Sequence, residues 1–307
     1  MRPSADITGS HEKYRMMFDL EDAFQDQNEY MCSADLKEFV EKNHLNLSQD
    51  GTFNPRDIFG SHDDSDHVYN TPRAWYMARC LNPSTMNWDG PDADFTPLSD
   101  DIPWCMVPEK KVTIEDVKYV LSSHFQGTPY DPYASYGDKS MKGAYRAIGV
   151  NRTDFLGIIQ MRPDAAEDSR AIEWVAFASN VFNTAAPFYT DVEKVPEYFS
   201  NTTGDASTDN FYWASRMIAA MADASYSKSI FHIERYQERV MSKGHEYINQ
   251  YDELLSKESD AEKRMQLRQE ANQKIADMVK KETQDTLNKV LYELSNQMKN
   301  AYSRSDA

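Results

Sequence analysis

Short apolar runs interrupt the polar sequence in the middle of the chain. Residues 145–150, 155–161 and 171–178 are rich in β-branched and aromatic side chains, which pack well on a pleated sheet. Turn-forming residues separate the runs, Asn151-Arg152-Thr153-Asp154 before the second and Arg162-Pro163-Asp164 before the third. This pattern predicts three consecutive strands of an antiparallel meander.

Four other segments carry apolar residues at helical spacing and are predicted to be helices. They are residues 33–43, 72–81, 113–124 and 208–225. Ser33 is a candidate N-cap, and Pro72 takes the first helical position, where its missing N–H costs nothing. Thr113 and Asp116 have the spacing of a capping box. Residues 13–20 have the composition of a further strand.

Two further stretches differ from these segments in composition and in the spacing of their apolar residues. Prolines recur among aspartates throughout residues 83–108, which excludes a helix interior and a central strand and predicts an ordered surface loop. Beyond residue 225 the chain is predicted to stay helical, but its apolar stripes do not hold one heptad register across Gly244 and residues 256–260. Helices packed on the protein's own core are favoured over a coiled coil that binds a partner.

Composition and charge narrow the classes of function. Of the 307 residues, 40% are hydrophobic and 12% aromatic, enough apolar material for a folded core. The net charge of −17 should repel nucleic acid and anionic lipid. The 3 Cys, at irregular spacings, indicate neither a disulfide framework nor a zinc site. With no long apolar run, we expect a cytoplasmic protein that binds neither nucleic acid nor a membrane.

Local motifs for cofactor chemistry are weak. The segment from His62 to His67 holds imidazoles and carboxylates that are candidate ligands of a divalent metal, but a solvated acidic loop is favoured because the spacing of a known cation site is missing. Neither G-x-G-x-x-G nor G-x-x-x-x-G-K-[ST] occurs. No metal and no other cofactor is therefore expected.

Candidate nucleophiles and bases are equally sparse. Cys32, Cys80 and Cys105 could each act only as a thiolate, and a small buried hydrophobe is the favoured role of each, although Cys32 directly precedes a predicted helix start. No G-x-S-x-G occurs, which leaves serine hydrolysis unsupported. His124, at a predicted helix end, is interpreted as a partner of the helix dipole rather than as a base.

A series of short sequence blocks, considered in their order and spacing, indicates a protein family more specifically than these single residues do. The blocks are Tyr69-Asn70-Thr71-Pro72-Arg73-Ala74-Trp75, Leu81-Asn82-Pro83-Ser84, the segment from Pro108 to Val117, His124-Phe125-Gln126-Gly127-Thr128, Arg146-Ala147-Ile148-Gly149-Val150-Asn151-Arg152-Thr153, Gln160-Met161-Arg162, Trp174-Val175-Ala176-Phe177, Pro187-Phe188-Tyr189 and Tyr212-Trp213. Over roughly residues 10–230 the chain resembles the dipeptidase A and secernin family of cysteine peptidases.

The resemblance implies an N-terminal-nucleophile hydrolase with an αββα sandwich, in which a cysteine at the mature N-terminus attacks the peptide bond and its own α-amino group is the base. It implies dipeptide hydrolysis without a metal. The nucleophile is expected upstream of Met1, because the blocks match the middle and C-terminal part of the family. Asn70 and Arg73 are candidates to meet a substrate carboxylate, with an ion pair inside the sandwich as the favoured role of Arg73.

We therefore expect an α+β protein, an αββα sandwich incomplete at its N-terminus, with residues 1–225 as a partial hydrolase domain and 226–307 as a helical region packed on it. The expected function is that of a cysteine-type dipeptidase fragment without its nucleophile. One alternative is a non-catalytic interaction protein, and another is a metal-dependent hydrolase using His62 and His67. Sheet surface left bare by missing strands predicts poor solubility or homo-oligomerisation.

Overall fold

The structure, a computed structural model, describes residues 33–49, 53, 58–60, 63–103 and 106–301. The strand predicted at residues 13–20 therefore lies outside the described residues, as do Cys32, His62 and Cys105. The chain divides into two compact units. The first comprises Met1–Trp75 and Asn82–Glu109, and the second comprises Tyr76–Leu81 and Lys110–Ala307.

Helices α2 (Leu36–Lys42) and α4 (Asp66–Tyr69) belong to the first unit, and α5 (Thr71–Leu81) begins in it. The helix predicted at 33–43 is confirmed with a later start. Asp35 occupies its N-cap position, and Ser33 instead donates a hydrogen bond to the Asp35 carboxylate at 2.7 Å. The prediction that Ser33 is the N-cap was wrong because the chain turns at residues 34 and 35 before the helix starts.

The proline-rich stretch contains neither helix nor strand in its described residues, as predicted. It is held in place by hydrogen bonds with tryptophan and asparagine side chains. The Asn82 side chain donates to Val107 O at 2.5 Å, Trp88 Nε1 donates to Asn82 O at 2.8 Å, and Trp75 Nε1 donates to Phe95 O at 3.1 Å. Both indoles are buried, so the loop is ordered around them.

A three-stranded antiparallel sheet forms the centre of the second unit. Its strands are β1 (Phe155–Met161), β2 (Ala171–Phe177) and β3 (Ala186–Tyr189), in the order β1-β2-β3. Phe155 lies opposite Phe177, and Ile172 lies opposite Tyr189. Two of the predicted strands, 155–161 and 171–178, are confirmed. The short β3 contains Pro187, which is tolerated because β3 is an edge strand.

The strand predicted at residues 145–150 was wrong, since these residues form bends and no strand. Their backbone bonds go elsewhere: Gly149 N donates to Ser123 O at 2.8 Å, and Val150 N donates to Ile148 O at 2.8 Å. A Cβ atom on Gly149 would lie 2.5 Å from Ser122 O, so glycine is needed for this close approach. The segment is thus fixed against the end of α6 instead of against a strand.

Helices complete the second unit. They are α6 (Ile114–Leu121), the 3-10 helix η3 (Glu167–Ser169), α7 (Glu197–Ser200), α8 (Phe211–Ala224), α9 (Tyr226–Leu255) and α10 (Ala261–Ser295). Thr113 and Asp116 form the predicted capping box of α6, with bonds of 3.1 and 3.0 Å, but the helix ends at Leu121 and not at residue 124. Helix α8 starts later than predicted because the Asn210 side chain accepts a hydrogen bond from Trp213 N at 2.9 Å.

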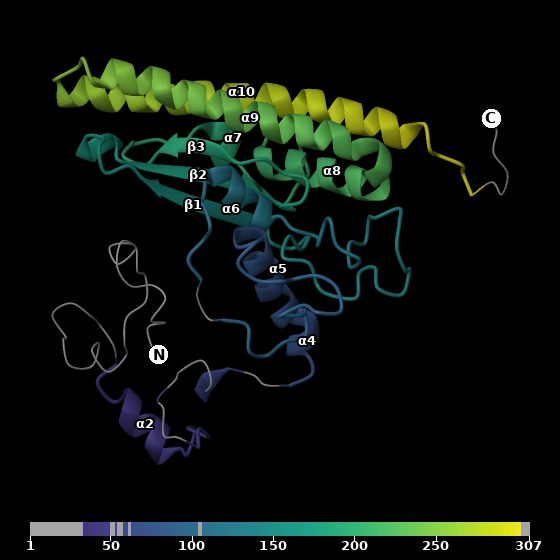
Figure 1. Cartoon of the computed structure of the whole chain (residues 1–307). Helices are drawn as coiled ribbons and strands as arrows, with labels where there is room; N and C mark the ends of the chain where they lie inside the picture. The colour runs from purple at the N-terminus through teal and green to yellow at the C-terminus, as the bar shows by residue number, and fades with distance from the viewer. Residues whose placement is uncertain (1–32, 50–52, 54–57, 61–62, 104–105, 302–307) are drawn as a thin grey trace. The chain divides into compact units, whose positions relative to one another are not determined.

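The long helices α9 and α10 run side by side over the sheet (Figure 1). Their apolar stripes and the sheet share one core. Its buried residues include Ile172, Trp174, Tyr189, Tyr236, Val240, Ile248, Tyr251, Ile275 and Val279. In the described part of the chain, no helix is long and apolar enough to cross a membrane.

Polar contacts fix α10 to the edge of the sheet. The Asn272 side chain accepts from Tyr189 N at 2.9 Å and donates to Tyr189 O at 3.0 Å, so it pairs with the edge strand as a neighbouring strand would. Arg264 and Arg268 both form ion pairs with Asp168, just before β2. The helical C-terminal region and the sheet therefore form a single packed structure.

One face of β1 remains exposed. Alternate residues of this strand point to the same side, and Phe155, Ile159 and Met161 are 51%, 69% and 60% exposed. β1 is also an edge strand in the described sheet. Three large apolar side chains on an edge strand are unusual for a free surface, because such edges pair readily with further strands.

Candidate functional site

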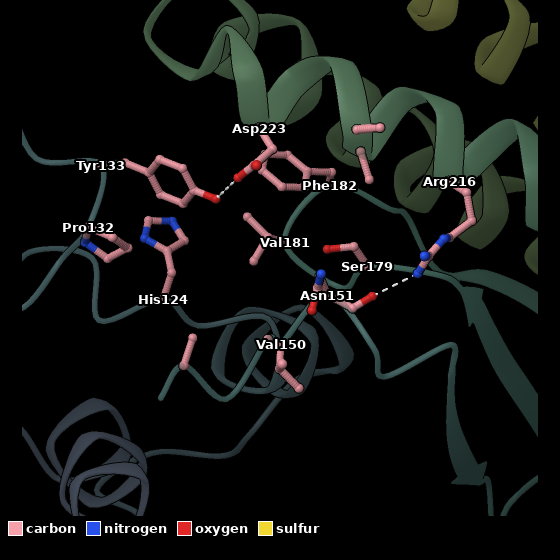
Figure 2. A pocket seen from close by; sticks show the side chains of 14 residues that line it. His124, Pro132, Tyr133, Val150, Asn151, Ser179, Val181, Phe182, Arg216 and Asp223 are labelled. Atoms are coloured by element: carbon pink, nitrogen blue, oxygen red, sulfur yellow. Dashed lines mark hydrogen bonds between the residues drawn. The ribbon is translucent and has the colours of Figure 1, made fainter. Parts of the chain in front are cut away.

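A pocket of about 360 Å³ opens in the second unit, within the size range of ligand sites. Figure 2 shows it between the loops that follow α6, the turn after β2 and one face of α8. Its lining residues are His124, Pro132, Tyr133, Ala147, Gly149, Val150, Asn151, Ser179, Val181, Phe182, Arg216, Ala219, Ala220 and Asp223. The wall is largely apolar, with a few polar groups that point inward.

His124 is held by partners on both ring nitrogens. Its Nδ1 lies 2.9 Å from Asp131 Oδ1, and both residues are buried. Because a carboxylate only accepts hydrogen bonds, Nδ1 carries a proton, and Nε2 lies 3.2 Å from the Tyr226 hydroxyl on the other side of the ring. The interpretation of His124 as a dipole partner at the end of a helix was wrong, because α6 ends three residues earlier and a specific carboxylate orients the ring.

Two tyrosines pack against His124, and one of them, Tyr133, lines the pocket. The rings of Tyr133 and Tyr226 stack with centroids 3.9 Å apart, and His124 meets both edge to face. Burial raises the pKa of both phenols well above its ordinary value. The hydroxyls therefore remain protonated and act as donors, with Tyr133 donating to Asp223.

Helix α8 presents the opposite wall. Arg216, Ala219, Ala220 and Asp223 lie on one face of the helix, because their spacing follows its turns. The guanidinium of Arg216 donates to Asn151 O at 2.9 Å and forms an ion pair with Asp154 at 3.4 Å. This wall thus carries a positive group, two small residues and a negative group in sequence.

A buried lysine lies behind the pocket. Lys118 Nζ donates to Ser122 Oγ at 2.6 Å and to Asn180 O at 2.8 Å, and burial lowers the pKa of the amine to about 7. Asn180 lies between Ser179 and Val181, which both line the pocket. Lys118 therefore supports the backbone of the wall and does not itself line the pocket.

The candidate metal ligand His67 and the candidate substrate-binding residues Asn70 and Arg73 lie in the N-terminal part of the described chain, and none of them lines the pocket. His67 lies in the first unit, where its Nε2 is 2.9 Å from Asp100 Oδ1. No group of three or more metal-ligating side chains occurs within the residues that the structure describes. The Asn70 side chain donates to Asp66 within α4 and its cap, and Arg73 is half-buried in the first turn of α5.

Cys80 is the candidate nucleophile that falls within the described part of the chain. It lies in the last turn of α5, half-buried, and burial raises the pKa of its thiol. A raised pKa leaves the group as a thiol at neutral pH, which disfavours attack on a carbonyl. This agrees with the prediction that Cys80 packs as a small hydrophobe.

Most polar groups of the pocket were not found by sequence reasoning. Asp131, Arg216 and Asp223 belong to no motif, and single charged residues in a chain with 50 acidic and 33 basic residues give no signal. Asn151 was recognised only as a turn residue. His124 and Asn151 do lie within blocks that carry the family resemblance.

Comparison with known proteins identifies the family to which the chain belongs. The chain belongs to peptidase family C69, whose profile matches residues 13–239. A dipeptidase of Bifidobacterium longum (strain NCC 2705) is 47% identical over 94% of this chain and 62% of its own length. A probable dipeptidase A of Streptococcus pyogenes serotype M18 is 45% identical over 92% and 57%, and dipeptidase A of Lactobacillus helveticus is 32% identical over 88% and 55%. The chain thus spans little more than half the length of these relatives.

Proposed function

We propose that this chain is the larger part of a cysteine-type dipeptidase, and that the pocket beside α8 receives the dipeptide. The observation that carries the proposal is the match to peptidase family C69 over residues 13–239, with relatives named as dipeptidases at up to 47% identity. The pocket adds chemical support, because it combines an apolar wall with an oriented imidazole, an arginine and a carboxylate.

We also propose that the sheet is one layer of an αββα sandwich, with residues 1–225 as the hydrolase domain and 226–307 as a helical region packed on it. Helices α9 and α10 share a core with the sheet, which supports one helical layer on one face. On the other face, the exposed Phe155, Ile159 and Met161 of β1 provide apolar surface on which a second sheet would pack. The occupant of this surface is a strand-rich segment of the same enzyme.

The nucleophile, in this proposal, is a cysteine outside the present chain. Cys80 is half-buried with a raised pKa, which makes it a poor thiolate. A nucleophile whose own α-amino group is the base must be the first residue of its mature polypeptide. Two of the matched relatives are longer by enough residues to supply another segment.

The test is an assay of the complete protein with dipeptides that have free termini. We expect hydrolysis that iodoacetamide abolishes and that a metal chelator leaves unchanged, because a thiolate and not a metal-bound water attacks the peptide bond. Loss of activity with the chelator alone would support a metal-dependent hydrolase. No hydrolysis of any dipeptide by the complete protein would refute the proposed function.

A further inference from the structure

Two side chains of opposite charge face the same pocket from one helix. Arg216 and Asp223 both line it, and Figure 2 shows them at opposite ends of the α8 wall. Between them on the same face lie Ala219 and Ala220, whose small side chains leave the wall open. A ligand that lies along this wall therefore meets a cation at one end and an anion at the other.

We propose that Arg216 binds the free carboxylate and Asp223 the free α-amino group of the dipeptide, so that α8 selects peptides by length. This inference rests on the proposed function, and it names the residues that would restrict the enzyme to dipeptides. A zwitterionic dipeptide is the ligand whose two end charges are complementary to this arrangement.

The positions of the two residues along α8 leave room for a ligand of this length. Arg216 and Asp223 are seven residues apart, so a rise of 1.5 Å per residue separates their Cα atoms by about 10.5 Å along the helix axis. Two extended residues span at most about 7 Å, and a charged contact at each end adds about 2.8 Å, for a total of about 12–13 Å. A third residue would add about 3.5 Å.

The arginine cannot freely follow a longer ligand, because its position is fixed. Its guanidinium donates to Asn151 O at 2.9 Å and pairs with Asp154 at 3.4 Å, and Tyr212 donates to the same Asp154 oxygen at 3.1 Å. Only one terminal nitrogen, Nη1, makes these contacts, and the side chain is 36% exposed. The rest of the fork remains available to a carboxylate.

Asp223 is suited to an ammonium group. Its Oδ1 accepts the hydrogen bond from Tyr133, which holds the carboxylate toward the pocket (Figure 2). Within the part of the chain that the structure describes, Asp223 forms no ion pair with a lysine, arginine or histidine, although it lies on an exposed position of α8. A ligand amine would supply the missing positive charge.

The experiment compares three substrates in the complete enzyme: a dipeptide, its N-acetyl derivative and its C-terminal amide. Their kcat/KM values are measured for the wild type, Asp223→Asn and Arg216→Gln, with Arg235→Gln on the exposed side of α9 as the control. We expect the wild type to prefer the free dipeptide over each blocked form by about 10- to 100-fold. Arg216→Gln should remove only the preference over the amide, and Asp223→Asn only the preference over the N-acetyl form.

This crossed pattern separates recognition from a structural role, because a damaged pocket would lower kcat/KM for all three substrates together. Equal losses, unchanged preferences in both variants, or a wild type that cleaves blocked dipeptides as well as free ones would overturn the inference while leaving the proposed function intact. Failure to cleave any of the three would remove the proposed function, and the inference with it.

Discussion

At the scale of single residues, Lys118 is a basic group that is almost completely removed from water. Its amine is buried without a carboxylate partner in the described residues, and its hydrogen bonds go to Ser122 and to the carbonyl of Asn180. Burial disfavours the charged form, so the pKa falls from its ordinary value of 10.5 to about 7.

This shift predicts how stability changes with pH. Above pH 7 the folded state releases the lysine proton while the unfolded state keeps it up to about pH 10.5, so the unfolded state binds more protons. The free energy of unfolding should therefore rise between pH 7 and 8.5, by at most about 1.4 kcal/mol per pH unit. Below pH 7 the amine is charged in both states, and the cost of burying the charge is present in full.

Urea unfolding of Lys118→Met at the two pH values provides the measurement. The variant should show a flatter change of the free energy of unfolding with pH, because the titrating group is gone. Lys111→Met, at an exposed position, serves as the control and should keep the wild-type slope. Equal slopes in wild type and Lys118→Met would show that Lys118 does not titrate in this range.

At this scale, roles that depend on neighbouring residues could be predicted from the sequence. Roles that depend on partners far along the chain could not. The capping box of Thr113 and Asp116 follows from neighbouring residues and was predicted. The partners of His124 are Asp131, across a turn, and Tyr226, which is 102 residues away. No local rule brings such residues together, so the role of the imidazole was misread.

At the scale of elements, the crossing of α9 over β3 depends on Gly244. A Cβ atom there would lie 2.6 and 2.8 Å from the ring carbons Cδ and Cγ of Pro187, closer than packed atoms approach. The glycine that interrupts the heptad pattern is therefore a point of contact between a helix and the sheet. α9 continues through it without a break.

Gly244→Ala should accordingly destabilise the protein. Overpacking against a rigid proline ring costs about 1–3 kcal/mol, which outweighs a gain of up to about 1 kcal/mol from the better helix former. Ser242→Ala, an exposed position on the same helix, is the control and should be neutral or slightly stabilising. Unfolding of Gly244→Ala at the same or a higher urea concentration than the wild type would contradict the requirement for glycine at this contact.

The elements themselves were predictable where composition and tertiary contacts agree. Residues 155–161 and 171–177 form strands because each pairs with its neighbour along the chain. Residues 145–150 have a similar composition, but Gly149 bonds to Ser123 at the end of α6, and no strand forms. β3 was not predicted, because its proline argues against a strand anywhere except at the edge of a sheet. Its place at the edge is known only from the fold.

At the scale of the whole molecule, we propose that the pocket belongs to a dipeptidase whose nucleophile lies outside this chain. The described part of the chain supplies one sheet, the long helices over it and an oriented set of polar groups in a pocket. The chain belongs to peptidase family C69, and the proposed dipeptide hydrolysis rests on that membership. The exposed apolar face of β1 provides the surface on which the second sheet of the proposed sandwich would pack. Homo-oligomerisation of the isolated chain stays a prediction from that same surface.

The most direct test of the central claim is to identify which cysteine iodoacetamide modifies as the complete protein loses dipeptidase activity, by peptide mass spectrometry with and without a protecting dipeptide. We predict that the protected cysteine is none of Cys32, Cys80 and Cys105, and that a variant with serine at all three positions is inactivated at the wild-type rate. Protection and loss of activity that map to one of these three cysteines would contradict the account.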